Sequence, residues 1–141
     1  MTAPRARFGG IDIVSKDMAA SLAFYRELGL DIPEDTVYVD NGAPQHVTVK
    51  IDSEVGVDID SDTLTGGYDP QWPAGQGGVV VIFRTDTRAD VDALHDHMVR
   101  LGHPSHLAPF DAFWGARYAI LVDPDGHLVS LMSPTDGGDT A

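Results

Sequence analysis

Two segments of similar sequence lie 73 residues apart in the chain: YRELGL at residues 25–30 and MVRLGH at residues 98–103. Each closes an amphipathic stretch at a glycine, which is typical of a helix end. One β-rich segment precedes each helix and three follow it, so the chain is predicted to contain two tandem βαβββ modules of the α+β class. Because a half of this size cannot bury its own sheet alone, the two modules must pair into a single domain over residues 1–141.

Module one is predicted over residues 8–60. The stretch FGGIDIVS at 8–15 alternates like a strand, Asp17 is placed to cap a helix from Met18 to about Leu28, and Gly29 ends that helix. β-Branched residues at every second position then predict three short strands at 36–40, 46–51 and 55–59. A linker rich in Gly and Pro is predicted over residues 61–77.

Module two is predicted over residues 78–134, starting with the strand GVVVIF at 78–83. Thr87 with Asp90 resembles a capping box that opens a helix. The apolar stripe of that helix consists of Val91, Leu94, Met98 and Leu101. Three strands follow at 106–110, 117–122 and 127–132, and the Gly- and Asp-rich tail at 135–141 is predicted to be frayed.

Composition narrows the possible partners. The chain has 9 Lys and Arg against 22 Asp and Glu, a net charge of −13, which disfavours nucleic acid and anionic lipid and favours cationic small molecules. The same charge could simply keep the protein soluble. Without cysteine there is no disulfide, thiolate nucleophile or Cys-bound metal. No apolar run reaches the length of a membrane span and no signal peptide is recognisable, so a cytoplasmic protein is expected.

Several motifs resemble one known family. SKDMAASLAFYRELGLDIP and FWGARYAILVDPDGHLVSL are similar to the first helix and the last hairpin of the vicinal oxygen chelate superfamily, which includes glyoxalases, ring-cleaving dioxygenases and bleomycin-type resistance proteins. The resemblance spans about residues 8–134. DMAASLAFYR, YDPQW and WGARYAILVDPDG together resemble its mitomycin-binding branch. It implies a cupped mixed β-sheet with the helices outside, and a homodimer.

Strand alternation sorts the side chains between the two faces of this sheet. One set is expected to face the helices: Ile11, Ile13, Val47, Val49, Ile51, Val55, Val57, Ile59, Val129 and Leu131. The opposite set is expected to face the cup: Gly10, Asp12, Tyr38, His46, Thr48, Asp58, Val80, Ile82, Leu128, Ser130 and Met132.

A metal site is not predicted. The resemblance implies metal ligands that are His or Gln on the first strand of each module and Glu on a last strand. The matching positions hold Gly10, Val80 and Ser130, with the fourth near Asp58, and a catalytic metal needs about three protein ligands. Asp12, His46 and Asp58 remain conceivable replacement ligands. The two carboxylates could equally be solvated or contact a polar or cationic ligand.

Aromatic residues cluster in PFDAFWGARY at 109–118, and a flat conjugated ligand could stack on them. The resemblance implies that Trp114 and His46 hold a drug, although Trp114 could instead pack at a dimer contact and His46 could make a structural hydrogen bond. Phe110 stands where the branch has a second Trp. Trp72 could cover the pocket or anchor its own segment. The predicted ligand-binding residues are Trp114, His46, Phe110, Phe113, Tyr38, Trp72, Tyr118, Asp12, Asp58 and Ser130.

The favoured hypothesis is a metal-independent protein, with no cofactor and no catalytic residue, that sequesters an aromatic or quinone-like antibiotic of the mitomycin, bleomycin or enediyne type. Such a protein would give self-resistance by lowering the free drug concentration. One alternative is a metal-dependent lyase, isomerase or dioxygenase of the superfamily. Another is a metal-free catalyst that uses Asp12, Asp58 or His46 as an acid or base.

Overall fold

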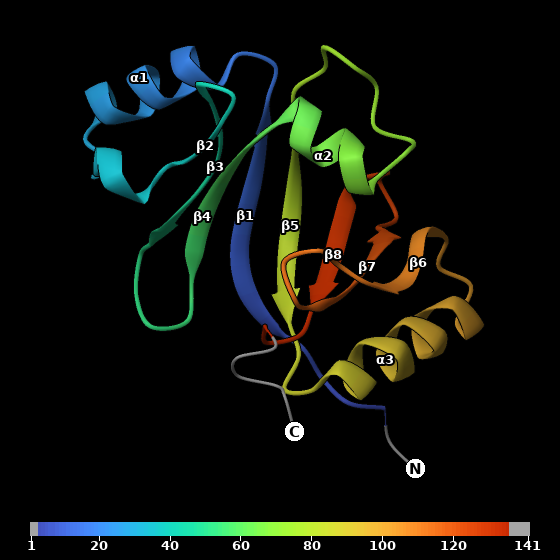
Figure 1. Ribbon diagram of the computed structural model, residues 1–141. Coiled ribbons are helices and arrows are strands. Elements are labelled where there is room, and N and C mark those ends of the chain that lie inside the picture. Colours follow the sequence, from blue (N-terminus) through green and yellow to red (C-terminus); the bar gives the residue numbers. More distant parts are fainter. Residues whose placement is uncertain (1–2, 136–141) are drawn as a thin grey trace. The chain divides into compact units, whose positions relative to one another are not determined.

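The computed structural model describes residues 3–135 and shows a mixed α+β fold (Figure 1). The chain divides into two compact units, which we treat separately. Gly10–Val79 form the N-terminal unit, and the described residues before Gly10 and after Val79 form the C-terminal unit.

The sheet of the N-terminal unit has the strand order β2-β3-β4-β1, with β1 at Arg7–Ser15, β2 at Tyr38–Asp40, β3 at Ala43–Lys50 and β4 at Gly56–Ser61. β1 and β4 run parallel, and the other pairs are antiparallel. Helix α1, Met18–Leu28, follows β1. The Asp17 side chain accepts a hydrogen bond from the Ala20 N–H, and Gly29 ends the helix with a left-handed φ of 114°, as predicted.

One face of this sheet packs against α1. Val47 and Ile59 are completely buried there, together with Leu22 of the helix. Each such side chain contributes about 1.5–3 kcal/mol when it leaves water. The predicted alternation is confirmed for the members of this core that come from the strands: Ile13, Val47, Val49, Val57 and Ile59.

The sheet of the C-terminal unit has the strand order β5-β8-β7-β6, with β5 at Gly78–Arg84, β6 at Ser105–Asp111, β7 at Arg117–Val122 and β8 at Leu128–Met132. β5 and β8 run parallel, and the other pairs are antiparallel. Helix α3, Arg88–Arg100, begins where the Thr87 side chain accepts from the Asp90 N–H, as predicted. Its buried face, led by Val91, packs on Ala119, Leu121 and Leu131.

The predicted linker at 61–77 contains an additional helix. Asp62–Tyr68 form α2, and the Ser61 side chain caps it by accepting from the Leu64 N–H. Sequence propensity opposes this helix, because Gly66 and Gly67 both lie within it. The cap and the burial of Thr65, which is 1% exposed, outweigh that propensity locally.

Strand boundaries also differ from the predicted ones. Only Tyr38–Asp40 of the segment 36–40 is a strand, since a 3-10 turn occupies Glu34–Thr36. β3 ends at Lys50, so Ile51 lies in the following turn and is 56% exposed, not directed at the helix. β4 continues past the predicted end at 59 to Ser61. The tail predicted to be frayed at 135–141 lies outside the described residues except for Thr135.

The helices are short, at 11 residues for α1, 7 for α2 and 13 for α3. Within residues 3–135 no helix combines the length and the apolar character that crossing a bilayer requires.

Candidate functional site

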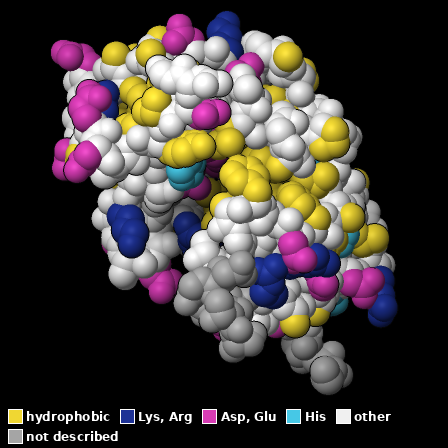
Figure 2. All heavy atoms as spheres, viewed as in Figure 1, with side chains coloured by type: hydrophobic (Ala, Val, Ile, Leu, Met, Phe, Trp, Pro, Cys, Tyr) yellow, Lys and Arg dark blue, Asp and Glu magenta, His cyan; other side chains and the backbone are white. Residues whose placement is uncertain are grey.

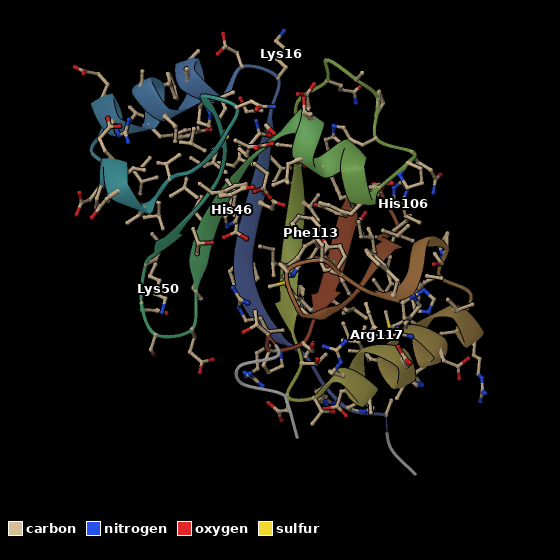
Figure 3. All side chains as sticks on the ribbon, viewed as in Figure 1. Lys16, His46, Lys50, His106, Phe113 and Arg117 are labelled. Atoms are coloured by element: carbon tan, nitrogen blue, oxygen red, sulfur yellow. The ribbon has the colours of Figure 1, made fainter. Side chains whose placement is uncertain are left out.

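The sheet face opposite α1 carries polar side chains from three strands. Asp12 of β1 pairs with Asp58 of β4, which pairs with Thr48 of β3, and His46 of β3 pairs with Asp60 of β4. Residues directly opposite each other on neighbouring strands point to the same side of a sheet. We call these five residues the polar face. Figure 3 labels His46 on this face.

His46 links two members of the polar face. Its Nδ1 contacts Asp60 Oδ1, and its Nε2 lies 3.2 Å from the Thr48 hydroxyl oxygen. Burial lowers the pKa of His46, but the hydrogen bond to Asp60 and the charges of Asp60 and Asp58 outweigh it and raise that pKa above 6.5. The histidine side chain is 38% exposed, whereas that of Asp60 is 8% exposed. The imidazole can therefore exchange a proton with solvent or a ligand while Asp60 orients it.

Asp12 is the most buried carboxyl in contact with this pair, at 5% exposure. Burial, followed by the charge of Asp60, a side-chain hydrogen bond with Asp60 and the charge of Asp58, raises the pKa of Asp12 well above 3.8. A neutral Asp12 can donate to Asp60. Its Oδ1 atom has no hydrogen-bond partner among the described residues. Asp60 thus accepts from Asp12 on one side and from His46 on the other.

In the C-terminal unit, four rings form an aromatic cluster: Phe110, Phe113, Trp114 and Tyr118. The ring centroids of Trp114 and Tyr118 are 5.0 Å apart, those of Phe113 and Trp114 5.1 Å, and those of Phe110 and Tyr118 5.9 Å, all edge to face. Tyr118 is 4% exposed, whereas Phe113 is 69% exposed. The cluster therefore extends from the buried ring of Tyr118 to the solvent-exposed ring of Phe113. Figure 2 shows hydrophobic side chains on the surface of the protein in this view.

A tight turn between β6 and β7 presents the outer rings. The Ala112 N–H donates to the Ala116 carbonyl at 2.8 Å, and the Gly115 N–H donates to the Ala112 carbonyl at 3.0 Å. These bonds close the loop that carries Phe113 and Trp114, and Figure 3 labels Phe113 there. The rings are thus held by backbone hydrogen bonds in addition to their mutual contacts.

The rest of the sheet face opposite α3 is mainly apolar. Ser130 pairs with Ile82 on one side and Ile120 on the other, so all three point to the face that Tyr118 also shares. Ser130 is 1% exposed, and its hydroxyl has no hydrogen-bond partner among residues 3–135. The Ser130 hydroxyl is therefore a buried polar group whose hydrogen-bonding capacity no described residue satisfies.

The structure gathers the predicted site residues into two groups. His46, Asp12 and Asp58 meet in the N-terminal unit, where Tyr38 pairs with His46 and is 55% exposed. The aromatic cluster and Ser130 belong to the C-terminal unit. Trp72 donates its indole N–H to the Gln76 carbonyl at 2.9 Å and packs on Gly78. These contacts attach Trp72 to its own segment of the chain.

Comparison with known proteins agrees with this fold. A family model described as the Glyoxalase/Bleomycin resistance protein/Dioxygenase superfamily matches residues 7–131. The chain belongs to this superfamily. An uncharacterized protein of Mycobacterium bovis is 29% identical over 123 residues, which cover 86% of this chain and 80% of the relative.

Two solved structures illustrate the fold of the superfamily. A superfamily member from Vibrio splendidus has a TM-score of 0.59 at 16% identity, over 92% of this chain and all of that one (100%). An extradiol ring-cleaving dioxygenase from B. fuscum has a TM-score of 0.62 at 21% identity, over 94% of this chain but 34% of the enzyme. Similarity at this level supports the fold alone.

The metal that many members of the superfamily bind does not fit the residues of this chain. Gly10 has a φ of 123°, and a Cβ there would overlap the Gly56 carbonyl, so β1 can carry no ligand side chain at that position. Val80 and Ser130 offer no charged or imidazole donor. Among the described residues, no group of three or more His, Asp or Glu is placed to hold a metal ion. No reaction step through a metal follows from these residues.

Sequence reasoning missed two residues that matter to the geometry. Asp60 is the partner of His46, but the predicted strand stopped at Ile59 and excluded it. The alternation of Asp58 and Asp60 was the available signal, since residues two apart share a face. Arg84, at the end of β5, was likewise one residue beyond the predicted strand.

Proposed function

We propose that this protein binds and sequesters an aromatic or quinone-like antibiotic of the mitomycin, bleomycin or enediyne type without a metal, and so confers self-resistance. It would act in the cytoplasm as a homodimer. Protection would then scale with the amount of protein, because each site holds one drug molecule at a time and does not convert it into a product.

The aromatic cluster is the observation that carries this proposal. Trp114 contacts a buried ring, Tyr118, and an exposed ring, Phe113, and is itself half-buried, so the part of it that solvent reaches would be available to a flat molecule. Each stacked pair adds about 0.5–1.5 kcal/mol beyond the burial of area. Such binding needs no nucleophile.

Direct binding measurements test the proposal. Quenching of tryptophan fluorescence should identify a binder in a panel containing mitomycin C, bleomycin and an anthraquinone. For that binder, Trp114→Ala should raise the Kd at least tenfold in equilibrium dialysis, a method that does not need the lost fluorophore. The thermal midpoint should change little, because Trp114 is only half-buried.

Phe24→Ala provides the matched control. Phe24 is an aromatic residue of α1 that is 58% exposed and lies outside the aromatic cluster. Its removal should leave the Kd within twofold of wild type. An unchanged Kd for Trp114→Ala, or equal losses in the two variants, would remove the aromatic cluster from the binding site. Failure of every compound in the panel to bind would contradict drug sequestration itself.

A second candidate function is favoured by the contact between His46 and Asp60. A histidine oriented by a buried carboxylate can act as a general acid or base without a metal. Mass spectrometry of the bound drug after overnight incubation separates the two functions. Recovery of unmodified drug at one equivalent per protein supports sequestration, whereas a product that accumulates over several turnovers supports catalysis.

The metal-dependent enzymes of the superfamily define the remaining alternative. Metal analysis of protein purified without chelator tests it. Stoichiometric Ni, Zn or Fe would contradict the metal-independent proposal.

A further inference from the structure

Among the residues that the structure describes, Arg84 differs from most of the arginines in having no carboxylate partner. Arg7, Arg26, Arg88, Arg100 and Arg117 each form an ion pair with Asp or Glu. The Arg84 side chain has no hydrogen bond or ion pair among the described residues 3–135, although it is half-buried. In a chain with 22 Asp and Glu, a half-buried guanidinium that contacts none of those between residues 3 and 135 is unexpected.

Backbone geometry holds the Arg84 side chain in place. A Cβ on Gly9 would lie 2.8 Å from both Cγ and Nε of Arg84, so the arginine stem lies flat against a residue that has no side chain. Any larger residue at position 9 would displace it. The guanidinium thus keeps its five N–H donors for an external acceptor in a position set by the fold.

Arg84 lies in line with the aromatic cluster. It pairs with Met132 of β8, and Met132 pairs with Tyr118 of β7, so all three point to the sheet face opposite α3. Two strand spacings separate Arg84 from Tyr118, about 10 Å across the sheet. Tyr118 in turn supports Trp114 at a centroid distance of 5.0 Å. One face of one unit therefore presents a ring of the edge-to-face aromatic cluster and, two strands away, an arginine with no carboxylate partner among residues 3–135.

From this arrangement we infer that the ligand is an aromatic anion: a planar fused-ring molecule that stacks on the aromatic cluster and directs a carboxylate, or the ionised oxygens of a hydroxyquinone, to Arg84. The inference rests on the proposed function and narrows its aromatic or quinone-like ligands to those that carry a negative charge. A guanidinium binds two oxygens of such a group at once, which a lysine does not reproduce. It also provides local attraction for an anion that the net charge of −13 would otherwise repel.

Two probes of matched shape test the charge requirement. Anthraquinone-2-carboxylate and anthraquinone-2-carboxamide share their rings and differ in charge. Wild-type protein, in calorimetric titrations at pH 7.5, should bind the carboxylate at least tenfold more tightly than the carboxamide. Arg84→Gln should reduce that ratio to about one by weakening the carboxylate alone, and Arg84→Lys should give an intermediate ratio.

Arg100→Gln is the matched control, because it removes the same charge from an exposed i,i+4 ion pair on α3. It should keep the wild-type ratio. If Arg84→Gln fails to fold by circular dichroism, Arg84→Lys carries the test. A lysine variant that retains the full wild-type ratio would then overturn the bidentate role of Arg84.

The outcomes separate the inference from the function on which it rests. Equal binding of the two probes by wild-type protein, or a preference that survives in Arg84→Gln, would overturn the inference while leaving aromatic binding intact. Binding of neither probe would overturn the inference, and the proposed function would fall with it only if no compound of the drug panel bound either. Loss of the preference in Arg84→Gln with an unchanged Kd for the carboxamide would establish Arg84 as the residue that selects an anion.

Discussion

In the N-terminal unit, the sheet face opposite α1 carries three carboxyl groups and a histidine. In the C-terminal unit, the face opposite α3 carries isoleucines, a methionine and a tyrosine that supports the aromatic cluster. The strand order and the parallel pairing of the first and last strands are the same in both units. Topology therefore determines which positions share a face, and the side chains alone determine what each face can bind.

Electrostatic interactions dominate the polar face, whereas aromatic contacts and apolar burial dominate the other. Asp12, Asp60 and His46 share protons and charge, so the polar face should respond to pH. The aromatic cluster depends on ring contacts and buried area, which no titration in the neutral range changes. Variants that separate backbone, protonation and hydroxyl effects can test this distinction.

The largest expected effect concerns the backbone beneath the polar face. Gly10→Ala places a Cβ against the Gly56 carbonyl at a φ of 123°, so β1 and β4 can no longer pair closely. We expect the free energy of unfolding to fall by about 3 kcal/mol or more. Urea denaturation followed by circular dichroism measures this loss.

Gly29→Ala isolates the cost of backbone strain alone. Gly29 has a similar φ of 114°, but a Cβ at this position would meet no atom within 4 Å. Its substitution should therefore cost only about 1–2 kcal/mol. Equal losses in the two variants would show that β1 and β4 separate easily and that contact with the Gly56 carbonyl adds no cost at position 10.

The next effect concerns protonation of Asp12. Its pKa is raised by burial and by Asp60, so above pH 3.8 the folded protein holds a proton that the unfolded chain has lost. The raised pKa of His46 has the same effect above pH 6.5, where the folded protein holds a proton that the unfolded chain has lost. Unfolding free energy should therefore fall as pH rises, by about 1.4 kcal/mol per pH unit for each group protonated only in the folded state.

Asp12→Asn mimics the neutral carboxyl and can still donate to Asp60. It should match wild-type stability near pH 3.8 and lose less stability by pH 8, as measured by urea denaturation across that range. Trp114→Ala, on the other face, should keep the wild-type pH dependence. If Asp12→Asn shows the same decline as wild type, the proton on Asp12 is not the cause.

Much of the fold was predictable because its signals are local. Asp17, Gly29 and Thr87 mark helix boundaries through hydrogen bonds within a few residues, and the alternation of Val47 and Ile59 follows from strand geometry. Helix α2 was not predictable in the same way. Its two glycines oppose a helix, and the burial of Thr65 that favours one is a tertiary property.

The candidate site was predictable in its residue types but less so in its contacts. His46, Asp12 and Asp58 were expected on one face, and strand pairing places them there. Asp60 and Arg84 were missed because each lies one residue past a predicted strand end, where sequence patterns are weakest. That Arg84 lacks a carboxylate partner within residues 3–135 depends on the positions of many carboxylates at once, which only the folded structure reveals.

The smallest expected effect concerns the hydroxyl of Ser130. It is 1% exposed and has no partner among the described residues, so the folded state carries an unsatisfied polar group between Ile82 and Ile120. Ser130→Ala should be neutral or stabilising by up to about 1 kcal/mol. Ser133, 2% exposed, is the matched control, because its hydroxyl accepts from the Arg117 N–H at 2.8 Å and donates to the Pro134 carbonyl at 2.9 Å. Ser133→Ala should cost about 1–2 kcal/mol, and a similar loss in Ser130→Ala in thermal denaturation would mean that the Ser130 hydroxyl is satisfied in solution.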